Sequence, residues 1–230
     1  MQNLPNAETY EKEFEFMPWG KLINKIETYL ITEMPKGCRV VDLMCGPGYL
    51  LGRLDQRRSD VVYMGVDLDN GFIDHAKGLY PRICFECADV VAWSTQKKFD
   101  VVICTGGVHH LPDNLQSTFI YKISCLLNTR GVAIIADPYI DDYDSQEGRI
   151  LAGARLGYEY LVATIKNGAP PDVIEAAIQV LRNDVLTLEW KTSFKKQRKV
   201  FEQYFKDVFM YKTWPAKKKG YGDCCFIVKK

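Results

Sequence analysis

The segment Val40–Leu51 does most to limit what this chain can fold into. An apolar run ends at Asp42, and Gly46 and Gly48 follow before a helical pattern starts at Tyr49. Glycine accepts positive φ and leaves the main chain bare for a ligand, while the free N–H groups of a helix start can face that ligand. The segment therefore predicts a strand, a tight loop and a helix, with a ligand site at the carboxyl end of the strand.

Short apolar runs and helical patterns alternate from this segment as far as Asp137. Such alternation is typical of a parallel β-sheet that is covered by helices on both faces. We therefore expect an α/β fold, in which Asn128–Arg130 form the turn before the fifth strand. The predicted strands of this region span residues 39–45, 61–67, 82–87, 100–104 and 131–137, and two more are predicted at 208–213 and 224–228.

The alternation breaks at residues 141–193, where two long helical patterns follow each other with no strand between them. A chain of 230 residues suits one domain with an insertion better than two full domains. We expect the insertion to roof the carboxyl edge of the sheet. The four predicted parts are an N-terminal helical cap (1–35), a ligand-binding core (36–140), the helical insertion or lid (141–193), and a C-terminal helix with a strand pair that completes the core (194–230).

Three acidic residues, Asp42, Asp67 and Asp89, stand at the ends of successive predicted strands. A dinucleotide would need a third small residue in the loop, where this chain has leucine, and its phosphates would repel the first acid. S-adenosylmethionine has no phosphate and carries a cationic ammonium and sulfonium, so acids favour it. We expect Asp67 to bind the ribose hydroxyls and Asp89 the adenine amine, with Leu68 and Val90 on either side of the ring.

Further motifs support this interpretation, namely Phe99–Val102, His109–Asp113 and Leu126–Gly131. With the segments 41–48, 65–67 and 88–89, they make residues 36–137 similar to the class I (Rossmann-like, seven-stranded) S-adenosylmethionine-dependent methyltransferase family, in its small-molecule branch. The resemblance implies methyl transfer with S-adenosylmethionine as cofactor, and a doubly wound sheet of order 3-2-1-4-5-7-6 with an antiparallel last strand. The cofactor contacts predicted in this way are Asp42, Met44, Cys45, Gly46, Gly48, Asp67, Leu68, Asp89, Val90 and Thr105, and Met44 stands where the family usually has glycine.

Candidate catalytic residues follow the fourth and fifth predicted strands. Two of the three histidines, His109 and His110, lie after the fourth strand, and Asp137 lies at the end of the fifth. Because the methyl group of a sulfonium is already activated, the protein mainly has to orient the acceptor, and a base is needed only when the acceptor must lose a proton. The resemblance implies that His109 faces the acceptor as a base or orienting group. The alternative is that the two histidines pack the loop or cap a helix.

Aromatic side chains are the predicted walls of the site. Tyr139, after the fifth strand, and Tyr143 and Trp190 of the insertion are the predicted acceptor contacts. Aromatic residues near the N-terminus, Tyr10 and Trp19 among them, could fold over the cofactor. The alternative is that these residues belong to the core or to the interface of a homodimer. A roof of this kind favours a small, partly apolar acceptor over a polymer.

The charge of the chain is nearly balanced, with 30 Lys and Arg against 29 Asp and Glu, so no overall field attracts nucleic acid or an anionic membrane. The basic stretch 191–219 predicts a solvated helix face, because its charges lie opposite apolar residues at helical spacing. We expect transfer to a small-molecule acceptor, at oxygen. The alternatives are an RNA or protein methyltransferase that uses the basic face, and a non-catalytic cofactor-binding module. A nicotinamide-dependent reductase would need a Tyr-x-x-x-Lys pair, which the chain lacks.

The eight cysteines are scattered, and only Cys84 and Cys87 form a CxxC pair. That pair lies in a predicted strand, where residues three apart face opposite sides, so it is poorly placed to chelate a metal. We expect free or structural thiols, no metal site and a reducing, cytoplasmic environment. No run of 18 apolar residues and no signal-peptide pattern is found, so we expect no membrane span.

Overall fold

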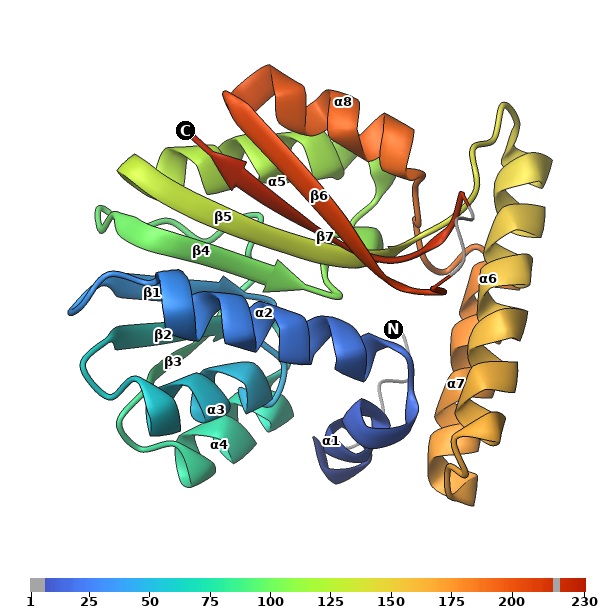
Figure 1. Ribbon diagram of the computed structural model, residues 1–230, viewed down its shortest axis with the longest axis horizontal. Coiled ribbons are helices and arrows are strands. Elements are labelled where there is room, and N and C mark those ends of the chain that lie inside the picture. The colour runs from blue at the N-terminus through green and yellow to red at the C-terminus, as the bar shows by residue number, and fades with distance from the viewer. Residues whose placement is uncertain (1–6, 217–219) are drawn as a thin grey trace.

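The computed structural model describes residues 7–216 and 220–230, and at its centre is one seven-stranded β-sheet (Figure 1). The strand order is β3-β2-β1-β4-β5-β7-β6. Strands β1 to β5 pair in parallel, whereas β7 runs antiparallel to both β5 and β6. The predicted sheet order and its antiparallel last strand are therefore confirmed. The strands are β1 (Arg39–Leu43), β2 (Val62–Asp67), β3 (Cys84–Cys87), β4 (Phe99–Thr105), β5 (Leu127–Tyr139), β6 (Asp207–Trp214) and β7 (Gly222–Lys229).

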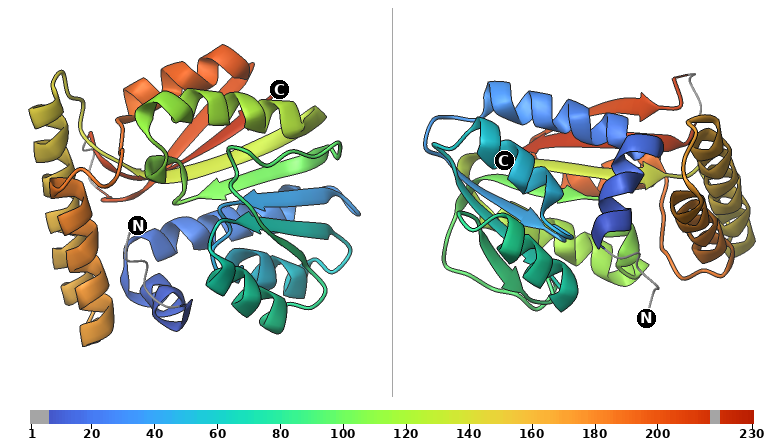
Figure 2. Two further views of the ribbon diagram at one scale, coloured as in Figure 1. Left: turned by 180° about the vertical axis from the view of Figure 1, so that it is seen from behind. Right: turned by 90° about the horizontal axis from the view of Figure 1, so that it is seen from below.

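Helices cover both faces of the sheet, because its central strands carry apolar side chains on both sides. In β1, Val40 packs into one core cluster and its neighbour Val41 into the other, as the two-residue period of a strand requires. Helices α2, α3 and α4 cover the first face, and α5 and α8 lie side by side on the second (Figure 2). These helices are α2 (Trp19–Glu33), α3 (Tyr49–Arg57), α4 (Asn70–Leu79), α5 (Asp113–Leu126) and α8 (Phe194–Tyr204).

The insertion forms a pair of helices, α6 (Gln146–Lys166) and α7 (Pro171–Val185), that stands across the carboxyl ends of the parallel strands (Figure 1). The pair packs closely because Gly157 has no side chain: a Cβ there would lie 3.1 Å from Cδ1 of Leu181. Helix α1 (Ala7–Phe16) contacts both α7 and α4. The predicted roof over the strand ends thus consists of α6 and α7, with α1 closing one side.

Two details of the chain course add to the sequence predictions. Residues 128–130 belong to β5, which pairs with β4 from Leu127 onward through a register shift, so the predicted turn is wrong. The register shift leaves residues 128–131 without paired residues in β4, and the Asn128 side-chain amide donates to the Asp100 Oδ1 over 2.6 Å. Among the described residues, no helix has both the length and the apolar character needed to cross a bilayer.

Candidate functional site

The loop after β1 has the backbone geometry that the glycine pattern predicts. Gly46 and Gly48 adopt positive φ values of 54° and 80°. A Cβ at Gly48 would also lie 2.8 Å from the Phe85 ring, so this position needs glycine for two reasons. Met44 has a φ of 63° as well, which explains why the family usually has glycine there and why a side chain at this position costs backbone energy.

Asp67, at the end of β2, holds this loop in place. Its Oδ2 accepts a hydrogen bond of 2.8 Å from the Gly46 N–H, and its Oδ1 accepts one of 2.9 Å from the Asp69 N–H. Burial raises the pKa of Asp67, although these N–H donors oppose the rise. Each carboxylate oxygen keeps a second lone pair, so the ribose role predicted for Asp67 stays open. Asp69 itself caps α4 by accepting from the Phe72 N–H.

Asp42, at the end of β1, is a buried acid with an unfilled acceptor. Its side chain is 2% exposed, and Oδ1 has no hydrogen-bond partner among the described residues. Burial, and next the charge of Asp67, raise the pKa of Asp42 to about 8. A buried acceptor beside two glycines suits a cationic ligand that lies against the loop. The residues present therefore fit the ammonium-bearing end of S-adenosylmethionine.

The third predicted acid, Asp89, lies at the same edge of the sheet. The Ala88 N–H donates to the Asp67 carbonyl over 2.8 Å, which fixes this segment beside β2. The Asp89 Oδ1 accepts from the Val91 N–H, so the side chain also serves a turn. Leu68 is 70% exposed, whereas Val90 is buried in the core. The adenine contacts of these residues stay a prediction.

A cavity of about 480 Å³ lies between the strand ends and helices α1, α6 and α7. Of the predicted site residues, the cavity is lined by Thr105, His109, His110 and Asp137. Tyr10 and Trp19 of the N-terminal cap also line it, and the Tyr10 ring lies beside Gly46, as expected for residues that fold over the cofactor. The cavity therefore extends from the ends of β4 and β5, where the candidate catalytic residues lie, to the side of the glycine loop.

His109 and Asp137 form a hydrogen-bonded pair inside this cavity. The His109 Nδ1 lies 2.7 Å from the Asp137 Oδ1, and both side chains are largely buried. The main chain is held as well, because the His109 carbonyl accepts from the Trp190 N–H over 2.7 Å. With Nδ1 engaged, Nε2 is the nitrogen that His109 can offer to a ligand, 3.7 Å from a Glu189 carboxylate oxygen.

His110 has a different environment. Its ring centroid lies 4.0 Å from that of His109, and its buried Nδ1 has no hydrogen-bond partner among the described residues. Burial, and next the charge of His109, lower the pKa of His110 to about 3. His110 is therefore neutral at physiological pH.

A buried charge cluster, which was not predicted from the sequence, lies at the end of the insertion. The Lys191 Nζ donates to Asp184 over 2.7 Å and also contacts Glu189, and all three side chains are buried. Burial favours the neutral amine, but the two carboxylates outweigh it and raise the pKa of Lys191. For Glu189, the charges of Lys191 and His109 overcome burial and lower its pKa to about 2. The only sequence signal was an acid and a base two residues apart after the second helix.

Glu13 is a second residue that sequence analysis missed. It belongs to α1, is 8% exposed and lines the cavity. Burial raises the pKa of Glu13 to about 8. The N-terminal cap thus contributes a titratable group to the site in addition to its aromatic side chains.

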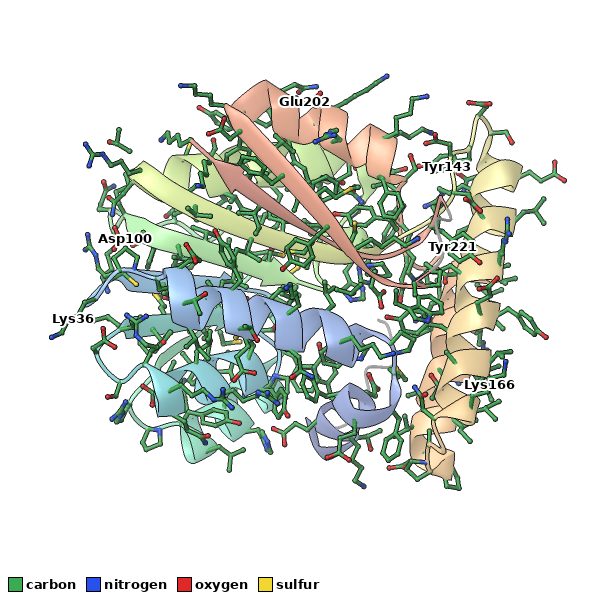
Figure 3. All side chains as sticks on the ribbon, viewed as in Figure 1. Lys36, Asp100, Tyr143, Lys166, Glu202 and Tyr221 are labelled. Carbon is green, nitrogen blue, oxygen red and sulfur yellow. The ribbon has the colours of Figure 1, made fainter. Side chains whose placement is uncertain are left out.

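The three predicted acceptor contacts do not line the cavity. Tyr139 is 1% exposed and packs against Phe194 and Phe226 in the core on the other side of the sheet. Tyr143 lies before α6, near α8, with the Lys196 ammonium 3.3 Å from its ring centroid (Figure 3). Trp190 acts through its main chain, which bonds His109 and Gln116. None of the three rings lines the cavity in this structure, because aromatic character alone does not tell which side of a strand or loop a residue takes. Their contact with an acceptor stays a prediction.

The basic stretch and the cysteines are placed much as expected. On α8, Phe201 is fully buried and Arg198 pairs with Glu202 on the outer side. Lys191 is the exception, because it is buried, and Lys217–Lys219 lie outside the described residues. All eight cysteines are free, and Cys84 and Cys87 are exposed.

The sheet order, the glycine loop and the acids at the strand ends together define the class I methyltransferase fold. Residues 40–131 match the family model of the methyltransferase domain. The solved structure of magnesium protoporphyrin IX methyltransferase from Synechocystis PCC 6803, with bound S-adenosylhomocysteine, superposes with a TM-score of 0.62 at 17% identity, covering 93% of this chain and 84% of that one. Residues 40–131 are thus similar to a methyltransferase domain, and the chain has the fold of the class I, S-adenosylmethionine-dependent methyltransferases.

Two further proteins show similarity to this chain, one in sequence and one in fold. Trans-aconitate 2-methyltransferase from Methylobacterium radiotolerans is 28% identical over 98 residues, which are 43% of this chain and 37% of that protein. A TehB-like methyltransferase from Corynebacterium glutamicum has a TM-score of 0.57 at 18% identity, covering 89% of this chain and 87% of that one. The match thus spans well under half the length of this curated relative.

Proposed function

We propose that this protein transfers the methyl group of S-adenosylmethionine to a small-molecule acceptor, and that it does so at oxygen. The observation that carries the proposal is the position of the His109–Asp137 pair, which lies in a cavity that reaches the side of the glycine loop. A volume of about 480 Å³ is in the range of small-molecule sites.

Each part of the site has a defined task in this proposal. S-adenosylmethionine supplies the activated methyl group. Asp42, Gly46 and Asp67 hold it at the carboxyl edge of the sheet, where the acids favour its positive charge. Helices α6 and α7 exclude water from the acceptor, which strengthens polar contacts in the cavity. His109 orients the acceptor and accepts its proton, with Asp137 keeping the imidazole in the correct orientation.

The charges that line the cavity support a neutral acceptor. Acidic side chains from Asp137, Glu175 and Glu189 line it, and Lys191 already pairs with two acids. A polyanion, such as the substrate that the name of the Methylobacterium relative implies, would meet more repulsion than attraction here. We therefore propose an uncharged hydroxyl compound.

The alternatives have less support. An RNA or protein substrate would need free cations beside the site, but Lys191 is buried, Lys196 is engaged with Tyr143, and Arg198 pairs with Glu202. A non-catalytic module would not need a buried His–Asp pair that faces a cavity. Substrate binding that weakens strongly with salt would indicate the first alternative, a nucleic-acid substrate.

The experiment that tests the proposal is calorimetric titration with S-adenosylmethionine, S-adenosylhomocysteine and NADPH in parallel, followed by a panel of hydroxyl compounds with release of S-adenosylhomocysteine as the readout. We expect binding of the first two ligands and turnover with at least one hydroxyl acceptor. Binding of NADPH alone would overturn the proposal, and methylation of amines but not hydroxyls would correct the acceptor atom.

A further inference from the structure

Three side chains at the inner wall of the cavity bring metal-ligand atoms together. His109, His110 and Glu189 each offer one such atom, and these atoms all lie within 4.8 Å of one another. All three residues line the cavity. Within residues 7–216 and 220–230, no other group of three histidine, cysteine or acidic side chains meets this condition. The cluster joins the loop after β4 to the segment after α7, which the sequence alone did not connect.

The ligand atoms are oriented by neighbouring groups. Asp137 holds the Nδ1 of His109 at 2.7 Å, so Nε2 is turned toward Glu189, 3.7 Å away. This carboxylate–imidazole arrangement is how proteins fix a metal-binding histidine. Glu189 is held in turn by Asn183, which donates to its Oε1, and by Lys191, which donates to its Oε2. Each carboxylate oxygen keeps a second lone pair for a metal ion.

His110 supplies the observation that is hardest to explain without a ligand. Its Nδ1 is buried and has no hydrogen-bond partner among the described residues. Buried polar atoms are nearly always satisfied in native proteins, so an unpaired ring nitrogen at a cavity wall points to a missing partner. Neutral imidazole nitrogen is a preferred donor for zinc and similar ions.

The charge balance points the same way. Asp137, Asp184 and Glu189 bring three acidic groups into this buried region, Lys191 brings an ammonium, and Arg149, whose guanidinium donates to the Glu189 carbonyl, adds a second cation. Acidic groups therefore outnumber cationic side chains here by three to two, and a bound metal cation would offset the excess. Buried charge of one sign is costly unless it is paired or coordinates a metal.

We propose that His109, His110 and Glu189 form a binding site for a divalent transition metal of the zinc class, with an open position toward the acceptor cavity. Two nitrogens and one carboxylate oxygen with an open position are the ligand set of catalytic zinc sites. The catalytic consequence rests on the proposed function: the acceptor is a hydroxyl compound whose oxygen takes the open position. With the metal bound, Nε2 of His109 is a ligand and no longer the base. The acceptor proton then leaves to water, the oxygen forms the new bond to the methyl carbon, and the electron pair of the broken S–C bond stays on sulfur.

The test uses the full chain, freed of metal with a chelator and then titrated with Zn²⁺ by calorimetry and with Co²⁺ by visible absorption. We expect micromolar or tighter Zn²⁺ binding and an intense Co²⁺ spectrum typical of four-coordinate geometry. His110→Ala and Glu189→Gln should each weaken binding about 100-fold, and Asp137→Asn about 10-fold or more. His75→Ala is the control. It removes the third histidine of the chain, which lies on α4 and does not line the cavity, and it should leave Zn²⁺ binding unchanged.

Folding of each variant is checked by its thermal midpoint and by binding of S-adenosylhomocysteine, and His110→Gln replaces His110→Ala if the latter unfolds. Absence of Zn²⁺ binding, or binding that His110→Ala leaves unchanged, overturns the metal site. Cofactor-dependent turnover that persists in metal-free protein overturns its catalytic role and leaves the proposed function standing. Zn²⁺ binding without any binding of S-adenosylmethionine would support the metal site and overturn the proposed function.

Discussion

The imidazole of His109 and the carboxylate of Asp137 lie 2.7 Å apart at the neighbouring ends of β4 and β5. The two strands are parallel and adjacent, so both residues reach the same edge of the sheet. Each was a candidate from the sequence, but the pairing follows from the register of β4 against β5, in which Thr105 stands beside Ala136. The pair is central to the acceptor site.

We predict that Asp137→Asn lowers kcat by about 100-fold or more, because an amide cannot hold His109 in the same tautomer and charge state. The dissociation constant for S-adenosylmethionine should stay the same, since Asp137 faces the acceptor side. Turnover is followed by release of S-adenosylhomocysteine. Asp74→Asn, an exposed change on α4, is the matched control, and an unaltered kcat in Asp137→Asn would show that the pair is structural.

Asp67→Ala should weaken binding of S-adenosylmethionine by about 10- to 100-fold, as expected for the loss of charged hydrogen bonds to the ribose. It also removes the acceptor that holds the Gly46 N–H, so its thermal midpoint must be recorded. Asp67→Asn, which keeps one acceptor oxygen, should bind S-adenosylmethionine more tightly than Asp67→Ala but more weakly than the parent protein. Cofactor binding as tight in Asp67→Ala as in the parent protein would refute the predicted role, and Asp144→Ala, at an exposed position before α6, serves as the surface control.

The affinity for S-adenosylmethionine should rise with pH up to about 8. Asp42 has its pKa raised to about 8 by burial and by Asp67, so it is protonated at neutral pH in the free protein. A cationic ligand favours the ionised form, and binding below pH 8 should therefore release a proton. Calorimetry in buffers of different ionisation enthalpy counts that proton. Asp42→Asn should bind more weakly and release none from this position; equal proton release from both proteins would contradict the assignment.

Glu13 should make the folded protein more stable at lower pH. Burial raises its pKa to about 8, so between about pH 4.5 and 8 the folded state holds a proton that the unfolded state has lost. The unfolding free energy therefore falls as the pH rises across this window, by at most about 5 kcal/mol at 1.36 kcal/mol per unit. Glu13→Gln should raise the thermal midpoint more at pH 8 than at pH 5. The reverse order would mean that Glu13 is stabilised as a carboxylate.

Gly48→Ala should lower the unfolding free energy by about 2 kcal/mol or more, because it places a Cβ at a φ of 80° and against the Phe85 ring. The matched control is Gly78→Ala in α4, where a Cβ would meet nothing within 4 Å. That change should stabilise the protein by about 0.5–1 kcal/mol, since alanine favours a helix. Denaturant unfolding of both variants measures the difference, and a neutral Gly48→Ala would argue against the loop geometry.

The cofactor side of the site was readable from the chain because its determinants are local. Asp42, Gly46 and Asp67 each follow a strand that its apolar run identifies, and parallel strands bring their carboxyl ends to one edge of a sheet. Backbone conformation at Met44 and Gly48 likewise depends on the tight turn itself. A pattern in sequence is enough to place such residues together.

The acceptor side was decided by tertiary packing. Glu189 and Lys191 reach His109 because α6 and α7 pack across the strand ends, and Glu13 reaches the cavity because α1 contacts α7. No periodic pattern encodes how an insertion or a terminal helix is set against a sheet edge. For the same reason the sequence does not reveal that the Tyr139 ring packs in the core. The sequence by itself determined the sheet, the glycine loop and the acids at the edge of the sheet. The packing of three helices across that edge decided which charges share the cavity, because this packing depends on contacts between residues far apart in the chain.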